Sequence, residues 1–114
     1  MGDRMTKILF IEDDLEMQEL LKDYLLHYDF HLTAFANPLE GMAQLKINHY
    51  DLVLLDLMLP ILDGFEVCKK IRQESNIPII ISSARGNLGD KVLAFEYGAD
   101  DYLAKPYEPK ELLI

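Results

Sequence analysis

Residues 52–56 read Leu52-Val53-Leu54-Leu55-Asp56, an unbroken apolar run that ends in an acid. Similar apolar runs occur at residues 7–11 and 79–81. Strands that are covered on both faces, as in a parallel sheet, have this uninterrupted character. Shorter strands are predicted at residues 31–35 and 101–103, which makes five strands in all.

Helical patterns alternate with these strands. Apolar residues recur at helical spacing, which predicts faces that pack on the sheet, in residues 17–28, 65–71 and 92–95. Asn37 and Pro38 are typical of the cap and first turn of another helix, and Asp63-Gly64 of a turn into the next. A last helix is predicted to start at Pro109, and it is truncated. The alternation predicts an α/β fold of five βα units with a doubly wound parallel sheet, in the strand order 2-1-3-4-5.

The composition is that of one globular domain. The chain has 114 residues, of which 50% are hydrophobic and 27% charged, enough for a single core. Its formal net charge of −9 argues against direct nucleic-acid binding by this chain. A single cysteine, Cys68, excludes an internal disulfide framework and is interpreted as a core residue. No apolar run approaches the roughly 18 residues of a membrane span, and there is no signal peptide, so we expect no membrane association and a cytoplasmic location.

Acidic residues follow two of the predicted strands directly. Glu12 and Asp13 follow the first strand and Asp56 the third, so they should converge where the strand order reverses, which is where such sheets bind ligands. Carboxylates about 4 Å apart repel by roughly 4 kcal/mol at an effective dielectric constant near 20, so the cluster must take up a proton, a lysine or a cation. Oxygen ligands favour Mg²⁺, and Lys105 after the last strand supplies a positive charge. A simpler interpretation is that the acids of residues 12–14 cap the helix that follows or lie in its first turn, and we accept this interpretation for Asp14.

Several separate motifs resemble the receiver domain of two-component response regulators, from residue 7 to the end of the chain. These motifs are Ile11-Glu12-Asp13-Asp14, residues 51–60, Leu62-Asp63-Gly64, residues 78–85 and residues 98–106. The resemblance is strongest to the OmpR/PhoB-type subfamily, whose members carry a winged-helix DNA-binding domain downstream. It implies a flavodoxin-like (βα)5 receiver at residues 5–114, with the DNA-binding domain absent from this chain. Residues 1–4 have no pattern and precede a second methionine, Met5, so they are expected to lie outside the fold.

The resemblance implies a phosphoacceptor and a metal site. Asp56 would take a phosphoryl group from the histidine of a partner sensor kinase. Asp13, Asp56 and the backbone carbonyl of Met58 would bind Mg²⁺, with Glu12 acting through water. The Met58 side chain is interpreted as an ordinary packing residue. Such a domain is a signalling phosphoacceptor and not an enzyme with a separate substrate, because it supports only its own phosphorylation and dephosphorylation.

The resemblance also implies which residues contact the phosphoryl group and which change position when it is bound. Lys105 would pair with the phosphoryl oxygens, and the Ser83 hydroxyl would donate a hydrogen bond to one of them. Ser83 and Tyr102 match the family's switch pair, in which the hydroxyl moves toward the phosphoryl group and the ring turns inward. The Lys105-Pro106 bond is expected to be cis, which is affordable only before proline.

In OmpR/PhoB-type receivers, phosphorylation promotes dimerisation through the fourth helix, fifth strand and fifth helix. We therefore expect a homodimer of the full-length protein, and the truncated last helix weakens this expectation for the chain itself. Lys91 with Glu111 is the first choice for an ion pair between chains. The candidate residues of the dimer face are Lys91, Glu96, Asp100, Asp101 and Glu111.

Two positions depart from the family pattern. The turn before the second strand usually contains Gly, whereas here Asp29 is expected to adopt the left-handed conformation. Glu108 stands where Ser or Asp usually caps the last helix, and it is a poorer cap. Neither position belongs to the acidic cluster.

Three other functions compete with the receiver interpretation. A magnesium phosphohydrolase with Asp56 as nucleophile would need a second acid where Met58 stands. A flavodoxin-like cofactor binder would need Gly, Ser or Thr after the first strand, where the acids of residues 12–14 repel phosphate. The main alternative is a receiver-like interaction module that does not depend on phosphate, although Asp56 and Lys105 are both present.

Overall fold

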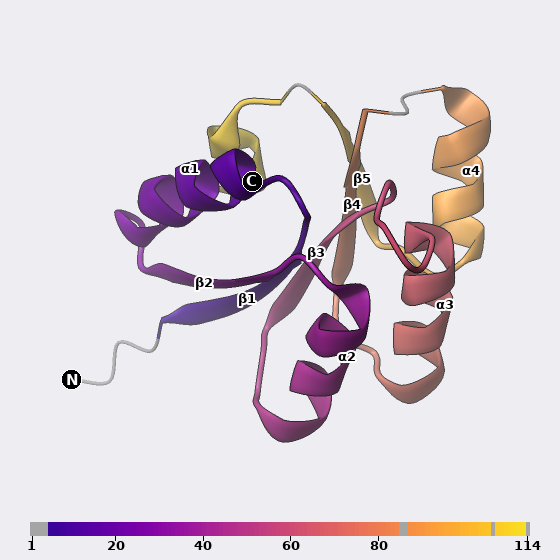
Figure 1. Cartoon of the computed structure of the whole chain (residues 1–114). Coiled ribbons are helices and arrows are strands. Elements are labelled where there is room, and N and C mark those ends of the chain that lie inside the picture. The colour runs from indigo at the N-terminus through magenta and orange to yellow at the C-terminus, as the bar shows by residue number, and fades with distance from the viewer. Residues whose placement is uncertain (1–4, 85–86, 106, 114) are drawn as a thin grey trace.

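The computed structural model describes residues 5–84, 87–105 and 107–113. Five parallel strands form one sheet in the order β2-β1-β3-β4-β5, which confirms the predicted order (Figure 1). Each strand includes its predicted run and extends slightly beyond it. The strands are β1 (Thr6–Ile11), β2 (Phe30–Phe35), β3 (Leu52–Asp56), β4 (Ile79–Ser83) and β5 (Asp101–Ala104).

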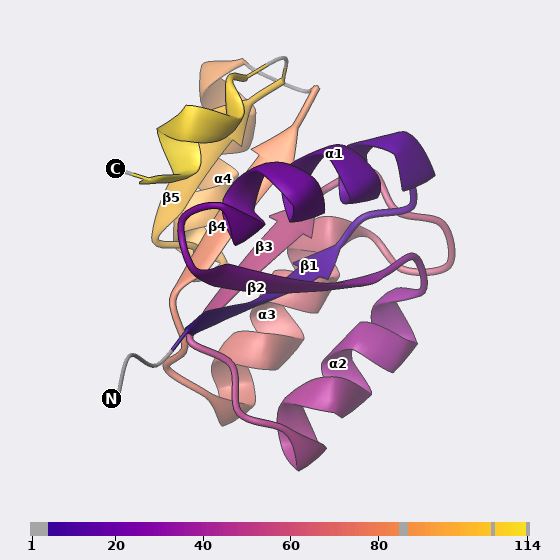
Figure 2. The same ribbon diagram turned by 90° about the vertical axis from the view of Figure 1, so that its left-hand side faces the viewer.

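Helices cover both faces of the sheet. They are α1 (Leu15–Leu26), α2 (Pro38–Ile47), α3 (Gly64–Glu74), α4 (Leu88–Glu96) and the short 3₁₀ helix η1 (Pro109–Leu113). Helix α1 and η1 lie on one face, and α2, α3 and α4 on the other (Figures 1 and 2). Asp14, Asn37 and Asp63 cap α1, α2 and α3 by accepting hydrogen bonds from backbone N–H groups. None of these helices, which are those of the described residues, is both long and apolar enough to cross a bilayer.

The sheet separates two apolar clusters because successive side chains on a strand point to opposite faces. Ile8, Phe10 and Leu54 pack with Leu21 and Leu25 of α1 on one face. The larger cluster on the other face includes Leu9, Ile11, Val53, Leu55 and Ile81 from the strands, with Phe65, Val67, Cys68 and Ile71 from α3. Burial raises the pKa of the Cys68 thiol to about 11, in keeping with its predicted role as a core residue.

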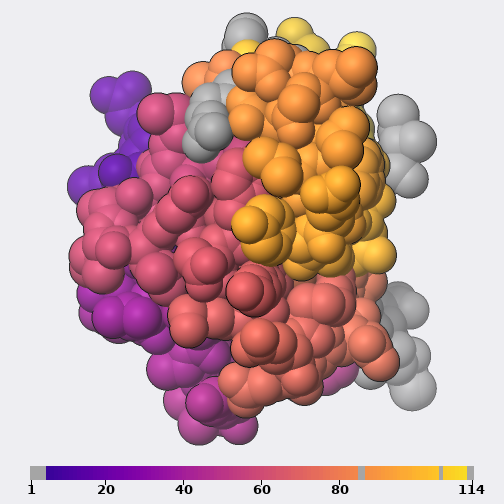
Figure 3. All heavy atoms as spheres, turned by 90° about the vertical axis from the view of Figure 1, so that its right-hand side faces the viewer, coloured from indigo at the N-terminus to yellow at the C-terminus, as the bar shows by residue number. Residues whose placement is uncertain are grey.

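Helix α4 differs from the sequence prediction. The expected core face of this helix is exposed, with Val92 at 47%, Leu93 at 40% and Phe95 at 49% exposure. The small side chain of Ala94 is buried instead, so α4 packs against its neighbours through a narrow contact. Figure 3 shows α4, in orange, as a raised surface beside α3.

Among the residues that the structure describes, two other than glycine have a positive φ. Asp29 has a φ of 65°, which confirms the predicted left-handed turn, and its carbonyl accepts a hydrogen bond from the N–H of Thr6 at the start of β1. Ile61 has a φ of 49°, which the sequence did not predict and which is rare for a β-branched residue. Ile61 lies in the loop between β3 and α3, beside the end of β3.

Arg72 connects the end of α3 to the loops on either side of it. Its guanidinium donates two hydrogen bonds to the Gly98 carbonyl and one each to the carbonyls of Ser75 and Ile77. It also pairs with Asp100, whose carboxylate oxygen lies 2.9 Å away. Gly98 has a φ of 105°, and a Cβ there would lie 2.8 Å from the Arg72 side chain. One side chain therefore holds the loops that precede β4 and β5.

Replacement of Arg72 should destabilise the fold markedly. Arg72→Ala leaves three carbonyls and a carboxylate without their donor, and we expect the free energy of unfolding to fall by about 2–4 kcal/mol. Urea denaturation followed by circular dichroism measures this change. The control is Lys69→Ala on the exposed side of α3, which should change stability by less than about 0.5 kcal/mol. Equal effects of both variants would contradict the anchoring role of Arg72.

Candidate functional site

Three carboxylates converge at the carboxyl ends of β1 and β3. Carboxylate oxygens of Glu12, Asp13 and Asp56 all lie within 4.8 Å of one another. Glu12 and Asp56 are nearly fully buried, at 1% and 4% exposure, whereas Asp13 is exposed. The two buried acids continue the alternation that points Phe10 and Leu54 toward α1, so the cluster lies on that face of the sheet.

Lys105 is the positive charge in this cluster. Its Nζ atom lies 2.6 Å from Oε1 of Glu12 and 3.6 Å from Oδ2 of Asp56. Burial alone would lower the pKa of Lys105, but the hydrogen bond to Glu12 and the charges of Asp56 and Glu12 outweigh burial and raise it. The stabilisation from this ammonium is therefore present at neutral pH and is lost as the pH rises through the raised pKa.

Hydrogen bonds fix the position of Glu12, although burial makes its negative charge unfavourable. Its side chain accepts a hydrogen bond from the N–H of Asp14, and its carbonyl accepts one from the side-chain amide of Gln18. Burial raises the pKa of Glu12 and Asp56 raises it further, while the hydrogen bond from Lys105 acts in the opposite direction. Three carboxylates thus face one ammonium group, and the cluster could hold a further cation.

The donor set of the cluster fits a hard divalent cation. Carboxylate oxygens from a few residues, one of them exposed, suit Mg²⁺, which keeps several of its waters. Asp13 stands at the solvent side and Asp56 at the floor. These residues could hold the metal while leaving positions open for another oxygen ligand.

The loop after Asp56 is fixed by a close approach of α3. Oδ1 of Asp56 accepts a hydrogen bond from the N–H of Met58, and the Leu57 carbonyl accepts one from Gly64. A Cβ at Gly64 would lie 2.4 Å from the Leu57 Cα and 2.5 Å from the Asp56 carbonyl oxygen, so only glycine fits there. The Asp63-Gly64 pair therefore both caps α3 and sets the position of the acid.

A shallow hollow of about 580 Å³ lies beside the cluster and is lined by Asp13 and residues 57–63. Met58 is 57% exposed at this hollow, so the interpretation of its side chain as a packing residue is wrong. The reason is its position in a loop beyond the end of β3, where no helix covers it. Ile61 at 68% exposure adds a second apolar group to the same rim.

Ser83 and Tyr102 lie on the other face of the sheet. Both are buried, with Tyr102 at 6% exposure, and Tyr102 lies opposite Ile81 in the strand register. The Ser83 carbonyl accepts a hydrogen bond of 2.7 Å from the backbone N–H of Lys105, which links the end of β4 to the lysine. The predicted cis bond involves Pro106, which lies outside the described residues, as do residues 1–4.

The comparisons with known proteins agree with this geometry. The chain matches the response regulator receiver domain over residues 8–114. The chain belongs to the response regulator receiver domain family. It is 41% identical over 109 residues to the response regulator ArlR of Staphylococcus aureus, covering 96% of this chain and 50% of ArlR, so the chain spans about half the length of this relative.

Solved receiver structures share the fold closely. The receiver domain of the Francisella response regulator 1452 has a TM-score of 0.90 at 32% identity, covering 95% of this chain and 90% of that one. The BeF3-activated N-terminal receiver domain of RstA from Klebsiella pneumoniae has a TM-score of 0.85 at 35% identity, covering 95% and 92%. The chain is thus a receiver domain of a two-component response regulator, as its sequence predicted.

The charged residues expected on the dimer face of this receiver domain differ in their surroundings. Lys91 and Glu96 are exposed on α4. Asp100 is paired with Arg72 of the same chain, and the Asp101 carboxylate accepts a hydrogen bond from the N–H of Tyr102. Glu111 accepts one from the N–H of Glu108, a contact that stabilises the start of η1.

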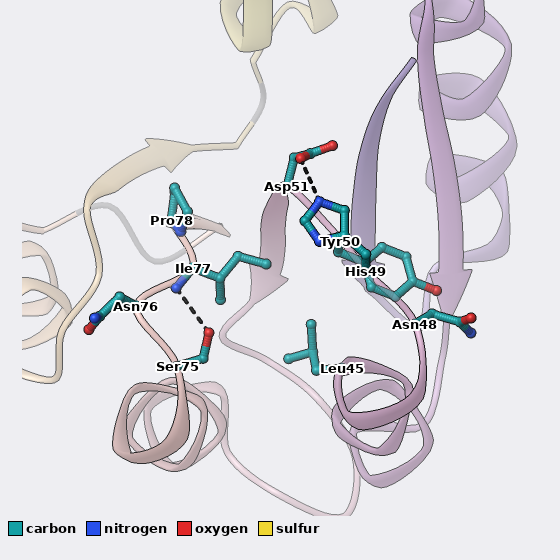
Figure 4. A pocket seen from close by; sticks show the side chains of 9 residues that line it. All are labelled: Leu45, Asn48, His49, Tyr50, Asp51, Ser75, Asn76, Ile77 and Pro78. Carbon is teal, nitrogen blue, oxygen red and sulfur yellow. Dashed lines mark hydrogen bonds and ion pairs between the residues drawn. The ribbon is translucent and has the colours of Figure 1, made fainter. Parts of the chain in front are cut away.

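A second hollow of about 400 Å³ lies at the opposite edge of the receiver sheet, before β3 and β4 (Figure 4). Nε2 of His49 lies 2.9 Å from Oδ1 of Asp51 at its rim, and the Ser75 hydroxyl accepts a hydrogen bond from Ile77. Because these residues precede the strands, they are separated from the acidic cluster by the length of the sheet.

Sequence reasoning missed two hydroxyl groups near the acidic cluster. Ser82 is fully buried at the end of β4, and the hydroxyl of Tyr107 is buried as well. A signal was present in the sequence, because Ser82 stands two residues after Ile80, at a position of a buried strand where an apolar residue is expected.

Replacing Asp13 by a neutral residue should raise the stability of the receiver domain and lower its affinity for Mg²⁺. Asp13→Asn relieves carboxylate repulsion, so we expect the melting temperature in EDTA to rise by about 2 °C. The same change removes a candidate metal ligand and should weaken Mg²⁺ binding about tenfold or more in calorimetric titration. Asp14→Asn is the matched control, since asparagine also caps helices, and it should leave Mg²⁺ binding unchanged. Wild-type affinity in Asp13→Asn would exclude this acid from the metal site.

Proposed function

We propose that this receiver domain is a phosphorylation-controlled switch in which Asp56 accepts a phosphoryl group from the histidine of a sensor kinase. The metal site assigned to it consists of Glu12, Asp13, Asp56 and the backbone carbonyl of Met58. The observation that supports the proposal is the convergence of three carboxylates with Lys105, whose Nζ lies 3.6 Å from Asp56. Asp56 is the acceptor in this assignment because it ends β3 at the floor of the cluster.

The transfer is an exchange of one bond to phosphorus for another. A carboxylate oxygen of Asp56 forms the new P–O bond as the P–N bond of the donor phosphohistidine breaks, and the imidazole keeps that electron pair and takes up a proton. Lys105 leaves Glu12 to pair with a phosphoryl oxygen, and the Ser83 hydroxyl donates a hydrogen bond to another. Mg²⁺, when bound, neutralises the charge that the transition state spreads over the phosphoryl oxygens.

In this proposal, the conformational response to phosphorylation begins at Ser83 and Tyr102, the switch pair on the α4 face of the sheet. The phosphoryl group biases this pair by its differential contacts, so the response is a shift in population and not a refolding. A homodimer through α4, β5 and η1 follows in the longer protein, where a winged-helix domain of the OmpR/PhoB type binds DNA and controls transcription. In this assignment the receiver acts in the cytoplasm and is a phosphoacceptor, not an enzyme that turns over a separate substrate.

Intact mass after incubation with acetyl phosphate and Mg²⁺ tests the acceptor. The Asp56 oxygen displaces acetate from phosphorus, so we expect one added phosphoryl group, with no adduct in EDTA or in Asp56→Asn. The matched control is Asp63→Asn, which keeps a helix cap on the same loop and should be phosphorylated like the wild type. A folded wild-type protein that gains no mass would overturn the proposal and favour the phosphate-independent module.

Sedimentation velocity with beryllium trifluoride, a phosphoryl analogue, tests the dimer face. We expect self-association of the wild type to increase with the analogue and Mg²⁺. Lys91→Glu should weaken it about threefold to tenfold, because like charges then face each other, and adding Glu111→Lys should restore it. A monomer with the analogue, or a double variant no better than the single one, would contradict this pairing.

A further inference from the structure

Ile61 adopts a backbone conformation that few β-branched residues tolerate. In the part of the chain that the structure describes, Asp29 and Ile61 are the two residues other than glycine with a positive φ. Aspartate enters this left-handed region comparatively easily, whereas the branched Cβ of isoleucine crowds the backbone there. The conformation of Ile61 is therefore strained, and it lowers the stability of the domain.

Packing within the domain does not offset this strain. Leu59 and Leu62 of the same loop pack against the core, but the Ile61 side chain is 68% exposed. Ile47 is similarly exposed, at 72%, yet it lies at the end of α2 and its φ is not positive. Asparagine or glycine at position 61 would adopt the same turn more easily. Ile61 is thus unfavourable for the isolated domain in both its backbone and its side chain.

The loop that carries Ile61 is anchored at both ends beside the candidate acceptor. At its start, the N–H of Met58 donates a hydrogen bond of 3.1 Å to Oδ1 of Asp56. At its end, the N–H of Gly64 donates one of 2.9 Å to the Leu57 carbonyl. Functional residues often stand on loops that a rigid scaffold positions in this way. The loop therefore presents Ile61 from a fixed base next to Asp56.

Ile61 lines the shallow hollow of about 580 Å³ beside the acidic cluster. Asp13, an acid of that cluster, lines the same hollow. Met58, at 57% exposure, adds a second apolar side chain to it, and methionine adapts easily to the shape of a partner. A molecule that occupies the hollow therefore lies against apolar groups and next to the acidic cluster at once.

The size of the phosphoryl donor decides whether it covers this hollow. A small donor such as acetyl phosphate needs to contact only the acidic cluster. A histidine on a protein brings the surrounding protein surface with it, and a specific interface buries roughly 800 Å² on each partner. Because the hollow shares Asp13 with the cluster, a footprint of that size around Asp56 includes Ile61.

We propose that Ile61 is a specificity-determining contact for the protein that carries the phosphohistidine, and that it packs against an apolar patch beside the donor histidine. The inference rests on the proposed function, since it names the surface through which the donor is recognised. Burial of this exposed side chain favours association with an apolar patch, whereas a charged group at the same place would lose its hydration. The strained conformation persists because it presents the side chain that the partner buries.

Thermal denaturation tests the strain. Ile61→Asn places a residue that tolerates the left-handed conformation in the same turn, so we expect the melting temperature to rise by about 3–5 °C. Ile47→Asn is the matched control, because it removes a similarly exposed isoleucine from a helix end and should not raise the melting temperature. An unchanged or lower melting temperature of Ile61→Asn would show that Ile61 stabilises the domain itself, and would overturn the proposal.

Phosphotransfer from a protein donor tests recognition. The donors are autophosphorylated cores of sensor kinases, purified as a panel, and the core that transfers fastest to the wild type is used for all variants. Ile61→Asn should lower kcat/KM for transfer about tenfold, because it removes an apolar contact at the interface. Ile61→Met keeps an apolar side chain and should retain most of the wild-type value, and Ile47→Asn should retain all of it. Wild-type transfer to Ile61→Asn, or an equal loss in Ile61→Met, would refute an apolar contact.

Acetyl phosphate separates recognition from the acceptor chemistry. With Mg²⁺ it should phosphorylate Ile61→Asn at the wild-type rate, because a small donor does not need the apolar contact. Equal losses with acetyl phosphate and with the kinase core would assign Ile61 to the reaction itself and contradict recognition. A wild type that acetyl phosphate cannot phosphorylate would overturn the proposed function, and this inference with it. A wild type phosphorylated by acetyl phosphate but by none of the kinase cores would overturn the inference alone.

Discussion

The site depends on the placement of one ammonium group among three carboxylates. Lys105 lies 2.6 Å from Glu12 and 3.6 Å from Asp56, and without it the buried acids would be uncompensated. The compensation is incomplete, since burial and Asp56 together raise the pKa of Glu12 despite the lysine. The donor set of Glu12, Asp13 and Asp56 could therefore hold a cation beside Lys105.

The rest of the fold brings these charges together and holds them. Glu12 directly follows β1, Asp56 ends the neighbouring β3, and Lys105 follows β5, two strands from β3, so the sheet itself sets their separation. Gly64 lets α3 press on the backbone at Asp56. Arg72 secures the loops before β4 and β5, the two strands that lead to the lysine. Distant contacts of α3 thus support the geometry of the charged cluster.

The two faces of the sheet carry different groups of candidate functional residues. Glu12, Asp56 and Ser82 point toward α1, whereas Ser83 and Tyr102 point toward α4. Lys105 connects the faces, because its side chain belongs to the acidic cluster and its backbone N–H is bonded to the Ser83 carbonyl. The α4 side also carries the exposed apolar side chains of Val92 and Phe95.

Local signals in the sequence determined the elements of this protein. Unbroken apolar runs identified the strands, Asp14, Asn37 and Asp63 marked the helix starts, and the acids after β1 and β3 pointed to the ligand edge. Tertiary structure decided what depends on neighbours distant in sequence. Periodicity could not show that α4 packs through Ala94, because an apolar stripe does not reveal which side its neighbours leave open. Likewise, Asp100 was expected on the dimer face, and only the fold showed that it pairs with Arg72, 28 residues earlier in the chain.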